Sequence, residues 1–276
     1  MTEAPQPAQT SQTAPEGGGT NGAVQPIVQM THVRLAFEEK VILKDLTLSV
    51  APRERLVIMG QSGGGKSTTL RLILGILHPG GGSVKFKGEE VTRMSRTRLN
   101  RMRQRIGMVY QYSALISSLS VRDNLALPLE ELTTKGKKEI DAIIEEKLAL
   151  VGMEDTREYM PSELSGGMRK RIGLARALVL NPELILFDEP SAGLDPVVSS
   201  VIDELIIGLT EKTNATSIIV THEMDSAFRI ATRMAMLYQG KIIEEDRPER
   251  FRHSTDAVVS QFVEGRTDGP ISTTQT

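Results

Sequence analysis

A glycine-rich segment constrains the fold of this chain more than any other feature of its sequence. It follows a short apolar run, RLVIM at residues 55–59, which has the length of a buried strand, and it precedes leucine and isoleucine residues at helical spacing between positions 70 and 74. A strand, a loop with the pattern GxxxxGK followed by Ser or Thr, and a helix, in this order, predict a phosphate-binding loop. The segment consists of Gly60, Gln61, Ser62, Gly63, Gly64, Gly65, Lys66, Ser67 and Thr68.

The chemistry of this loop follows from its residue types. Glycines let consecutive backbone N–H groups approach phosphate oxygens without crowding, and the helix N-terminus adds a positive dipole. Lys66 supplies a positive charge to the β- and γ-phosphates, and Ser67 supplies a hydroxyl ligand for Mg²⁺. The loop alone predicts a nucleotide and leaves GTPases, kinases, motors and transporters open.

A second motif places two acids at the end of an apolar strand. Residues 184–187 read LILF, and Asp188, Glu189 and Pro190 follow them. Because the carboxyl ends of strands in an open α/β sheet form the ligand-binding edge, we expect both acids beside the phosphate loop. Asp188 is then placed to hold Mg²⁺ through water, and Glu189 to polarise an attacking water. The alternative is an exposed acidic turn after a strand.

The wider pattern predicts an α/β fold, because strands alternate with helices as they do in a parallel sheet covered by helices. A helical block from about residue 112 to residue 180 interrupts the alternation and predicts a subdomain. The expected strands lie at residues 27–37, 41–50, 55–59, 106–110, 184–187 and 216–220, with hairpins at 83–91 and 234–244. The expected helices lie at residues 66–75, 121–151 with a polar break at 133–138, 168–180, 196–209 and 224–230.

A third motif, LSGGM at residues 164–168, precedes a basic amphipathic helix. Ser165, Gly166 and Gly167 at a helix N-terminus form a second anion site. One nucleotide does not need two such sites on one chain, so we expect a head-to-tail homodimer in which this loop closes on the γ-phosphate bound by the partner. Taken by itself, the motif also fits a plain helix N-cap after a flexible turn.

Composition excludes several other classes of protein. The 276 residues carry 33 Lys and Arg against 35 Asp and Glu, so a basic nucleic-acid-binding face is not expected. The absence of cysteine excludes a disulfide scaffold, a cysteine-ligated zinc site and thiol catalysis. No apolar run approaches the roughly 18–20 residues that span a bilayer.

Two segments outside the motifs have their own readings. Residues 1–25 lack Lys, Arg and apolar runs, which predicts a disordered tail, with a docking segment as the alternative, and excludes a signal or transit peptide. A basic run reads either as a solvated helix face or as a contact for anionic headgroups or an acidic partner. It comprises Arg93, Arg96, Arg98, Arg101, Arg103 and Arg105.

The motifs of this chain occur in the order typical of ABC transporter ATPases. They are the phosphate loop, a glutamine after a strand, LSGGM, LILFDEP, an SAGLD segment at residues 191–195 and a late histidine. The chain resembles this family from about residue 27 to residue 265. The resemblance implies a P-loop NTPase (RecA-like) core with an ABC-type antiparallel β subdomain and an α-helical signature subdomain. It also implies ATP and Mg²⁺ as cofactors, and ATP hydrolysis as the activity.

The resemblance also implies roles for individual residues. Phe37 resembles the aromatic residue that stacks on adenine, although Tyr is commoner there and core packing is the alternative. Gln111 is similar to the glutamine that senses Mg²⁺ and the attacking water and couples to the membrane partner. Asp195 resembles the aspartate that communicates across the dimer. His222 resembles the switch histidine that contacts the γ-phosphate, and its distance from Glu189 (222 − 189 = 33 residues) suits the family.

Finer features resemble the lipid-transport ATPases of the Mla/Mce type. These features are residues 106–115 and 120–125, the MPSE segment before LSGGM, the basic residues after it, and the ending QFVEGRTDGP at 261–270. The resemblance implies an integral-membrane permease of the MlaE type, an Mce-domain lipid-binding protein and a possible small regulatory subunit of the MlaB type. It implies a peripheral position on the cytoplasmic face of the inner membrane.

The domain layout expected from this resemblance is a tail at residues 1–25, an ATPase domain at 26–265 and a C-terminal tail at 266–276. The main alternative is the ATPase of a solute importer, for example for amino acids. A soluble ABC ATPase acting in translation or DNA repair usually carries paired cassettes or long coiled coils, which this sequence lacks. A regulatory module that no longer hydrolyses ATP conflicts with the intact Glu189 and His222.

Overall fold

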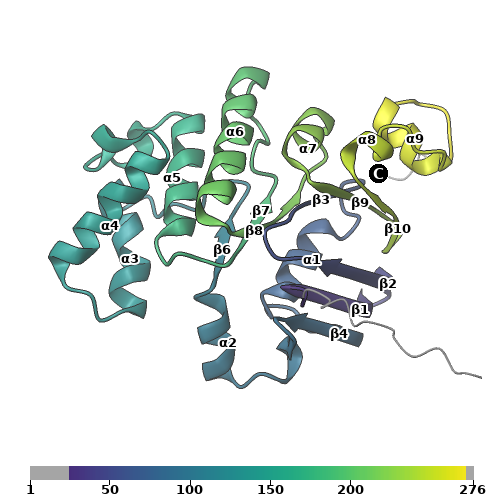
Figure 1. Cartoon of the computed structure of the whole chain (residues 1–276), viewed down its shortest axis with the longest axis horizontal. Helices are drawn as coiled ribbons and strands as arrows, with labels where there is room; N and C mark the ends of the chain where they lie inside the picture. Colours follow the sequence, from purple (N-terminus) through teal and green to yellow (C-terminus); the bar gives the residue numbers. More distant parts are fainter. Residues whose placement is uncertain (1–24, 272–276) are drawn as a thin grey trace, which may run out of the picture.

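The computed structural model describes residues 25–271, which form two sheets and the helices packed around them (Figure 1). One sheet has the strand order β10-β9-β3-β8-β7-β6, and the other β2-β1-β4-β5. The strands are β1 (Val28–Phe37), β2 (Lys40–Val50), β3 (Arg55–Met59), β4 (Gly81–Phe86), β5 (Glu89–Glu90), β6 (Ile106–Val109), β7 (Leu184–Asp188), β8 (Thr216–Val220), β9 (Arg233–Tyr238) and β10 (Lys241–Asp246). The helices are α1 (Lys66–Ile73), α2 (Arg96–Arg103), α3 (Val121–Leu132), α4 (Lys137–Leu150), α5 (Gly166–Leu178), α6 (Pro196–Thr213), α7 (Met224–Ile230), α8 (Pro248–Phe251) and α9 (Ala257–Glu264).

The six-stranded sheet is the core of the molecule, and its strands β6, β7, β8, β3 and β9 run parallel. It is buried on both faces, which is why its strands read as continuous apolar runs. In β3, Leu56 and Ile58 face one hydrophobic cluster while Val57 and Met59 face the other. The hairpin partner β10 adds an antiparallel edge strand.

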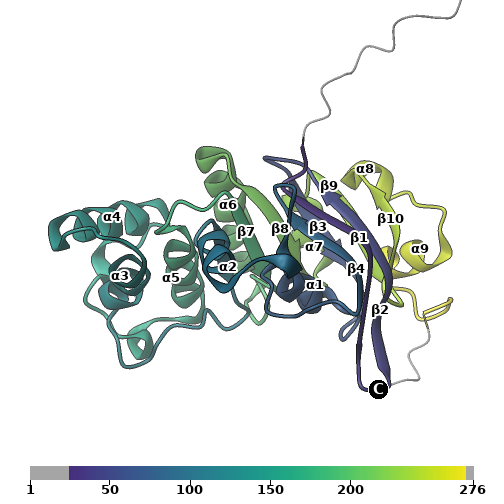
Figure 2. The ribbon, with the colours of Figure 1, turned by 90° about the horizontal axis from the view of Figure 1, so that it is seen from below.

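The two faces of this sheet are covered differently. Helix α1 and the antiparallel sheet β2-β1-β4-β5 cover one face, where Leu70 and Ile73 of α1 join Val28 and Leu48 in one cluster. Helices α5, α6 and α7 cover the other face through residues such as Ile172, Ile206 and Ile230. Figure 2 shows the antiparallel strands at one end of the molecule and α3, α4 and α5 at the other.

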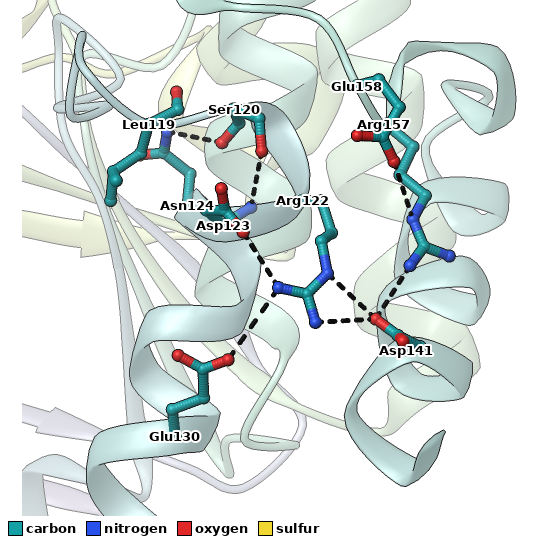
Figure 3. A network of polar contacts seen from close by, with 9 residues as sticks. All are labelled: Leu119, Ser120, Arg122, Asp123, Asn124, Glu130, Asp141, Arg157 and Glu158. Atoms are coloured by element: carbon teal, nitrogen blue, oxygen red, sulfur yellow. Dashed lines mark hydrogen bonds and ion pairs between the residues drawn. The ribbon is translucent and has the colours of Figure 1, made fainter. Parts of the chain in front are cut away.

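Helices α3, α4 and α5 lie within residues 112–180, and the assignment of this stretch as a subdomain stays a prediction. An ion-pair network joins parts of this region (Figure 3). Arg122 of α3 and Arg157 of the loop before α5 both contact Oδ1 of Asp141 in α4, at 2.9 and 2.8 Å. Asp123 and Glu130 also contact Arg122. The network therefore joins α3, α4 and the segment that leads to LSGGM.

The predicted pattern of strands and helices matches the structure closely, with ends that differ by a few residues. The helix predicted at 168–180 is α5, which begins at Gly166, and the helix predicted at 196–209 continues to Thr213. The polar break predicted at 133–138 separates α3 from α4. Of the tail predicted at 1–25, only Gln25 lies within the described residues.

The first residues of the predicted C-terminal tail lie against the body of the protein. The side-chain amide of the buried Gln261 accepts a hydrogen bond from Ile271 N (2.7 Å) and donates one to Ile271 O (3.2 Å). Tyr238 donates to the carbonyl of Pro270 at 3.3 Å. Residues 266–271 are therefore attached to α9 and β9 by hydrogen bonds. The domain boundary at residue 265 stays a prediction. Between residues 25 and 271, no helix has the length and apolar character needed to cross a bilayer.

Candidate functional site

The carboxyl ends of four neighbouring parallel strands bring the predicted motifs to one edge of the core sheet. The phosphate loop follows β3, His222 follows β8, Asp188 ends β7, and Gln111 follows β6. These strands are adjacent in the order β3-β8-β7-β6. A parallel arrangement makes all four ends point the same way, so residues up to 162 positions apart in the sequence (222 − 60) meet at one edge.

Two glycines of the phosphate loop occupy places where no side chain fits. Gly60 has φ +148°, and a Cβ there would lie 2.2 Å from the carbonyl oxygen of Leu237. Gly65 has φ +101°, and a Cβ there would lie 3.0 Å from Leu43 Cδ2 and 3.2 Å from Ile42 Cγ2. The loop is thus wedged between β9 and β2, which fixes its curvature over the N-terminus of α1.

Lys66 is buried at the centre of the loop with 6% of its surface exposed. Its Nζ donates hydrogen bonds to the carbonyls of Gly60 (2.7 Å) and Gln61 (3.0 Å) and lies 4.0 Å from Glu189 Oε1. Burial lowers the pKa of Lys66, and the negative charges of Glu189 and Asp188 oppose that shift. The ammonium is therefore held against the loop by two of its backbone carbonyls.

The two acids have different neighbours. Asp188 accepts a hydrogen bond of 2.7 Å from the Ser67 hydroxyl, so the two predicted metal ligands touch each other. Glu189 lies 3.0 Å from His222 Nδ1, and its backbone N–H donates to Val220 O at 2.9 Å. The backbone of Glu189 is left-handed (φ 50°), which is uncommon for a residue other than glycine and is often found at functional sites.

A pocket of about 280 Å³ opens at this edge of the sheet. The predicted residues that line it are Ser62, Gly63, Gly65, Lys66, Ser67, Thr68, Gln111, Glu189 and His222. Three further predicted residues hydrogen-bond to residues of this lining. The carbonyls of Gly60 and Gln61 accept from Lys66, and Asp188 accepts from Ser67. Gly64 lies within the loop itself and donates its backbone N–H to Gln61 O.

Other predicted residues lie outside this pocket. Ser165 is the N-cap of α5, where its hydroxyl accepts a hydrogen bond from Met168 N at 3.2 Å. Asp195 is the N-cap of α6 and accepts from Val197 N and Val198 N, both at 3.0 Å. Both capping residues are exposed. Ser165 therefore caps its own helix and stays at the surface, and its role as an anion site for a partner's nucleotide stays a prediction.

Gly166, Gly167 and Phe37 are also absent from the residues that line the pocket. A Cβ on Gly167 would lie 2.8 Å from Val198 Cγ1, so the LSGGM loop packs against the start of α6. Phe37 ends β1 with 46% of its surface exposed and pairs with Lys40. Lys40 lines a second pocket of about 300 Å³, which lies along the outer side of the phosphate loop. The role of Phe37 in stacking stays a prediction.

Three residues of the site were missed by sequence reasoning. Ile42 of β2 lines the pocket, and only its strand position hinted at a buried role. Asn124 is 1% exposed, and its side chain bonds to backbone groups of Ile116, Leu119 and Ser120 in the loop that follows Gln111. Lys170 bonds to the carbonyls of Gln111 and Glu189, and its place on the apolar face of a predicted helix was the available signal.

A glycine-wedged phosphate loop beside a Ser67–Asp188 contact and a Glu189–His222 pair defines a P-loop nucleoside triphosphatase. Comparison with known proteins specifies which kind. The ABC transporter family model matches residues 43–192. The ATP-binding protein MlaF of the intermembrane phospholipid transport system of Haemophilus influenzae is 40% identical over 247 residues, which cover 90% of this chain and 94% of MlaF.

Two further proteins are similar over most of the chain. The probable ribonucleotide transport ATP-binding protein mkl of Mycobacterium tuberculosis is 40% identical over 88% of this chain and 68% of mkl. The dimeric cassette MJ0796, solved in a post-hydrolysis state with ADP and Pi, is 30% identical with a TM-score of 0.72 over 80% of this chain and 98% of that chain. This chain therefore belongs to the ABC transporter family and is an ATP-hydrolysing ATP-binding cassette. The predicted fold class is confirmed.

Proposed function

We propose that this chain is the ATPase subunit of an ABC transporter that moves phospholipids between membranes, energising a separate permease through ATP-driven closure of a homodimer. The observation that carries the proposal is the match with MlaF, which extends over nearly the whole of both chains at 40% identity. The site supports it because the groups needed to bind ATP and attack its γ-phosphate converge on one pocket.

Within that pocket, the proposed roles follow from the contacts. Lys66 and the loop N–H groups bind the β- and γ-phosphates, and Glu189 accepts a proton from the attacking water. His222 lies 3.0 Å from the Glu189 carboxylate and lines the pocket with Gln111, where both side chains would face the γ-phosphate of bound ATP. Most of the rate enhancement then comes from fixed positioning and electrostatics around the phosphates.

The residues present also fit a magnesium ion. Hydroxyl and carboxylate oxygens are ligands that Mg²⁺ prefers, and Ser67 Oγ and Asp188 Oδ1 lie 2.7 Å apart. Gln111 lines the same pocket. These three residues would hold the ion, which when bound neutralises charge on the β- and γ-phosphates.

The proposed homodimer completes the site. Ser165, Gly166 and Gly167 lie outside the pocket of their own chain, and Ser165 is exposed at a helix N-terminus that favours anions. A head-to-tail partner would place these groups on the γ-phosphate, with Asp195 at the same interface. The cassette MJ0796, solved as a dimer, supports this arrangement.

The proposed membrane partner is an integral-membrane permease of the MlaE type, in a complex with an Mce-domain lipid-binding protein and a possible small regulatory subunit of the MlaB type. This chain would sit at the cytoplasmic face of the inner membrane, held there by the permease. Exposed apolar side chains around the Gln111 loop would contact it, and Tyr112 is the most exposed of these at 85%. Nucleic acid is not among the proposed partners.

Mass spectrometry of proteins and lipids that co-purify with the chain from membranes tests this function. We expect a permease, an Mce-domain protein and bound phospholipid, all lost from Tyr112→Asp and retained by Ile243→Asp, a substitution of another exposed apolar residue, on β10. A periplasmic solute-binding protein without phospholipid would contradict the lipid assignment and favour a solute importer. Ribonucleotide in the complex would favour the activity named for mkl.

A further inference from the structure

One face of α5 carries Lys170, Gly173 and Arg176 at a spacing of three. Lys170 and Arg176 donate hydrogen bonds to backbone carbonyls near the active site, and Gly173 leaves room for Ser113. Residues at this spacing lie close to one another along a helix surface. Helix α5 (Gly166–Leu178) has 13 residues, and its N-cap is Ser165, the exposed serine of LSGGM. The same rigid element therefore starts at the loop proposed to meet the partner's nucleotide and passes behind the chain's own site.

Lys170 joins the two segments that carry the reacting groups. Its side chain is 5% exposed, and its Nζ donates to Gln111 O at 2.6 Å and to Glu189 O at 3.3 Å. Burial lowers the pKa of Lys170, while the charges of Glu223 and Glu189 oppose that shift. A buried ammonium needs hydrogen-bond acceptors, so both carbonyls are drawn to one point.

Gly173 and Arg176 hold the rest of the loop that follows Gln111. A Cβ on Gly173 would lie 3.3 Å from Ser113 Cβ, so the loop rests directly on the helix. Arg176 donates to the carbonyls of Ser113 (2.9 Å) and Ala114 (2.6 Å). Ser113 and Ala114 are both left-handed, with φ of 60° and 50°, a conformation that such residues keep when their surroundings enforce it.

We propose that Lys170 is a positioning residue, which ties the Gln111 loop and the catalytic Glu189 to helix α5 so that the seating of the LSGGM loop sets the geometry of the chain's own hydrolytic site. This inference rests on the proposed role of Glu189 as the base. Lys170 acts on the orientation of Glu189 and Gln111 and does not touch the nucleotide. Its removal should therefore change turnover and leave ATP binding to Lys66 and Ser67.

The test measures the phosphate-release rate and the affinity for a fluorescent ATP analogue in the purified full chain. For Lys170→Met we expect kcat to fall by about 10- to 100-fold, with the dissociation constant within about twofold of wild type. Lys170→Arg keeps a cation on the same face and should recover most of the rate. Lys147→Met is the matched control, because Lys147 is equally buried at 4% and bonds to Glu146 and Asn181 away from the site.

Three results would overturn the proposal. They are a wild-type kcat in Lys170→Met, an equal fall in the kcat of Lys147→Met, and a fall in the rate of Lys170→Met that weaker binding of ATP explains. If Lys170→Met does not unfold cooperatively in urea, Gly173→Ala replaces it as the test variant, because this substitution keeps every charge and crowds Ser113. A wild-type kcat in folded Gly173→Ala would also overturn the proposal. Glu189→Gln measured in parallel separates the two assignments. An active Glu189→Gln refutes the base, whereas an inactive Glu189→Gln beside a fully active Lys170→Met refutes only the positioning role.

Discussion

His222 contacts both carboxylate oxygens of Glu189: its Nδ1 lies 3.0 Å from Oε1, and its backbone N–H donates to Oε2 at 3.3 Å. His222, which follows β8, thus orients the carboxylate of Glu189, which follows β7. The side chain of Glu189 is only 12% exposed, and the Lys66 ammonium lies 4.0 Å from its Oε1. The pair gives the proposed base a fixed direction.

Glu189→Gln should bind ATP and form a stable dimer while hydrolysing it roughly 10²- to 10⁴-fold more slowly, because the amide keeps the shape but cannot accept the proton from water. Phosphate release and sedimentation with ATP measure the two effects. Turnover at the wild-type rate would show that another group is the base.

Lys66→Ala should weaken ATP binding by about 10- to 100-fold, since charge-assisted hydrogen bonds to the phosphates are lost. The buried ammonium is the loop's own cation, and it contacts Gly60 and Gln61 in this structure. Titration with a fluorescent ATP analogue measures the change. Unchanged affinity would refute the assignment of the phosphate loop.

Gly60→Ala should lower the free energy of unfolding by more than about 2 kcal/mol, because its methyl group would collide with Leu237 O at a backbone angle that only glycine adopts readily. Gly208→Ala is the control. Gly208 lies in α6 with nothing within 4 Å of a Cβ, so alanine should stabilise the helix by about 0.5–1 kcal/mol. Urea unfolding measures the free energy of unfolding of both variants. Equal changes in the two would argue against the tight contact between Gly60 and Leu237 of β9.

Glu183 links the turn after β4 to the core sheet, and its pKa is lowered from 4.5 to about 2 by Arg105 and Lys87. A depressed carboxylate pKa contributes stability above pH 4.5 that is lost as the pH falls toward 2. Because the side chain is 41% exposed, solvent screening reduces this contribution to about 1 kcal/mol.

Glu183→Gln should therefore be less stable than wild type by about 1 kcal/mol at pH 7. The difference should shrink as the pH falls from 4.5 toward about 2, because Glu183 of the unfolded wild-type chain takes up a proton that the folded chain does not yet bind. Urea unfolding at several pH values measures it. A difference that does not depend on pH would mean that the pairing of Glu183 with Arg105 and Lys87 is not the cause.

Sequence reasoning predicted the core of the site because its signals are local. The run before Gly60 and the run before Asp188 each identify a buried strand, and parallel strands place their carboxyl ends together. The contacts of Lys170 and Asn124 could not be predicted in this way. They join segments whose approach depends on how the helical subdomain packs on the core, and a basic residue inside RKR reads equally well as solvated.

The basic run before β6 shows the same limit. Its spacing suggested one charged face, but the structure divides it: Arg103 donates to Leu74 O and Gly75 O, and Arg105 pairs with Glu183. Arg93, Arg96 and Arg101 are exposed. Arg103 and Arg105 therefore connect α2 and the segment after it to the ends of α1 and β7. Counting charges in the sequence does not distinguish these two residues from exposed arginines.

The claim that each site is shared between two copies is tested most directly by mixing two inactive variants. Lys66→Ala removes the phosphate cation, and Ser165→Asp keeps the N-cap of α5 while placing a negative charge where the γ-phosphate is expected. In a mixed head-to-tail dimer, one site carries both defects and the other carries neither.

We expect each variant alone to be inactive and the mixture to recover phosphate release at about one quarter of the wild-type rate, the value for random exchange and independent sites. Subunit exchange is confirmed by pull-down of a tagged variant. A mixture that exchanges subunits and stays inactive, or a Ser165→Asp protein with wild-type activity, would contradict a site built from two chains.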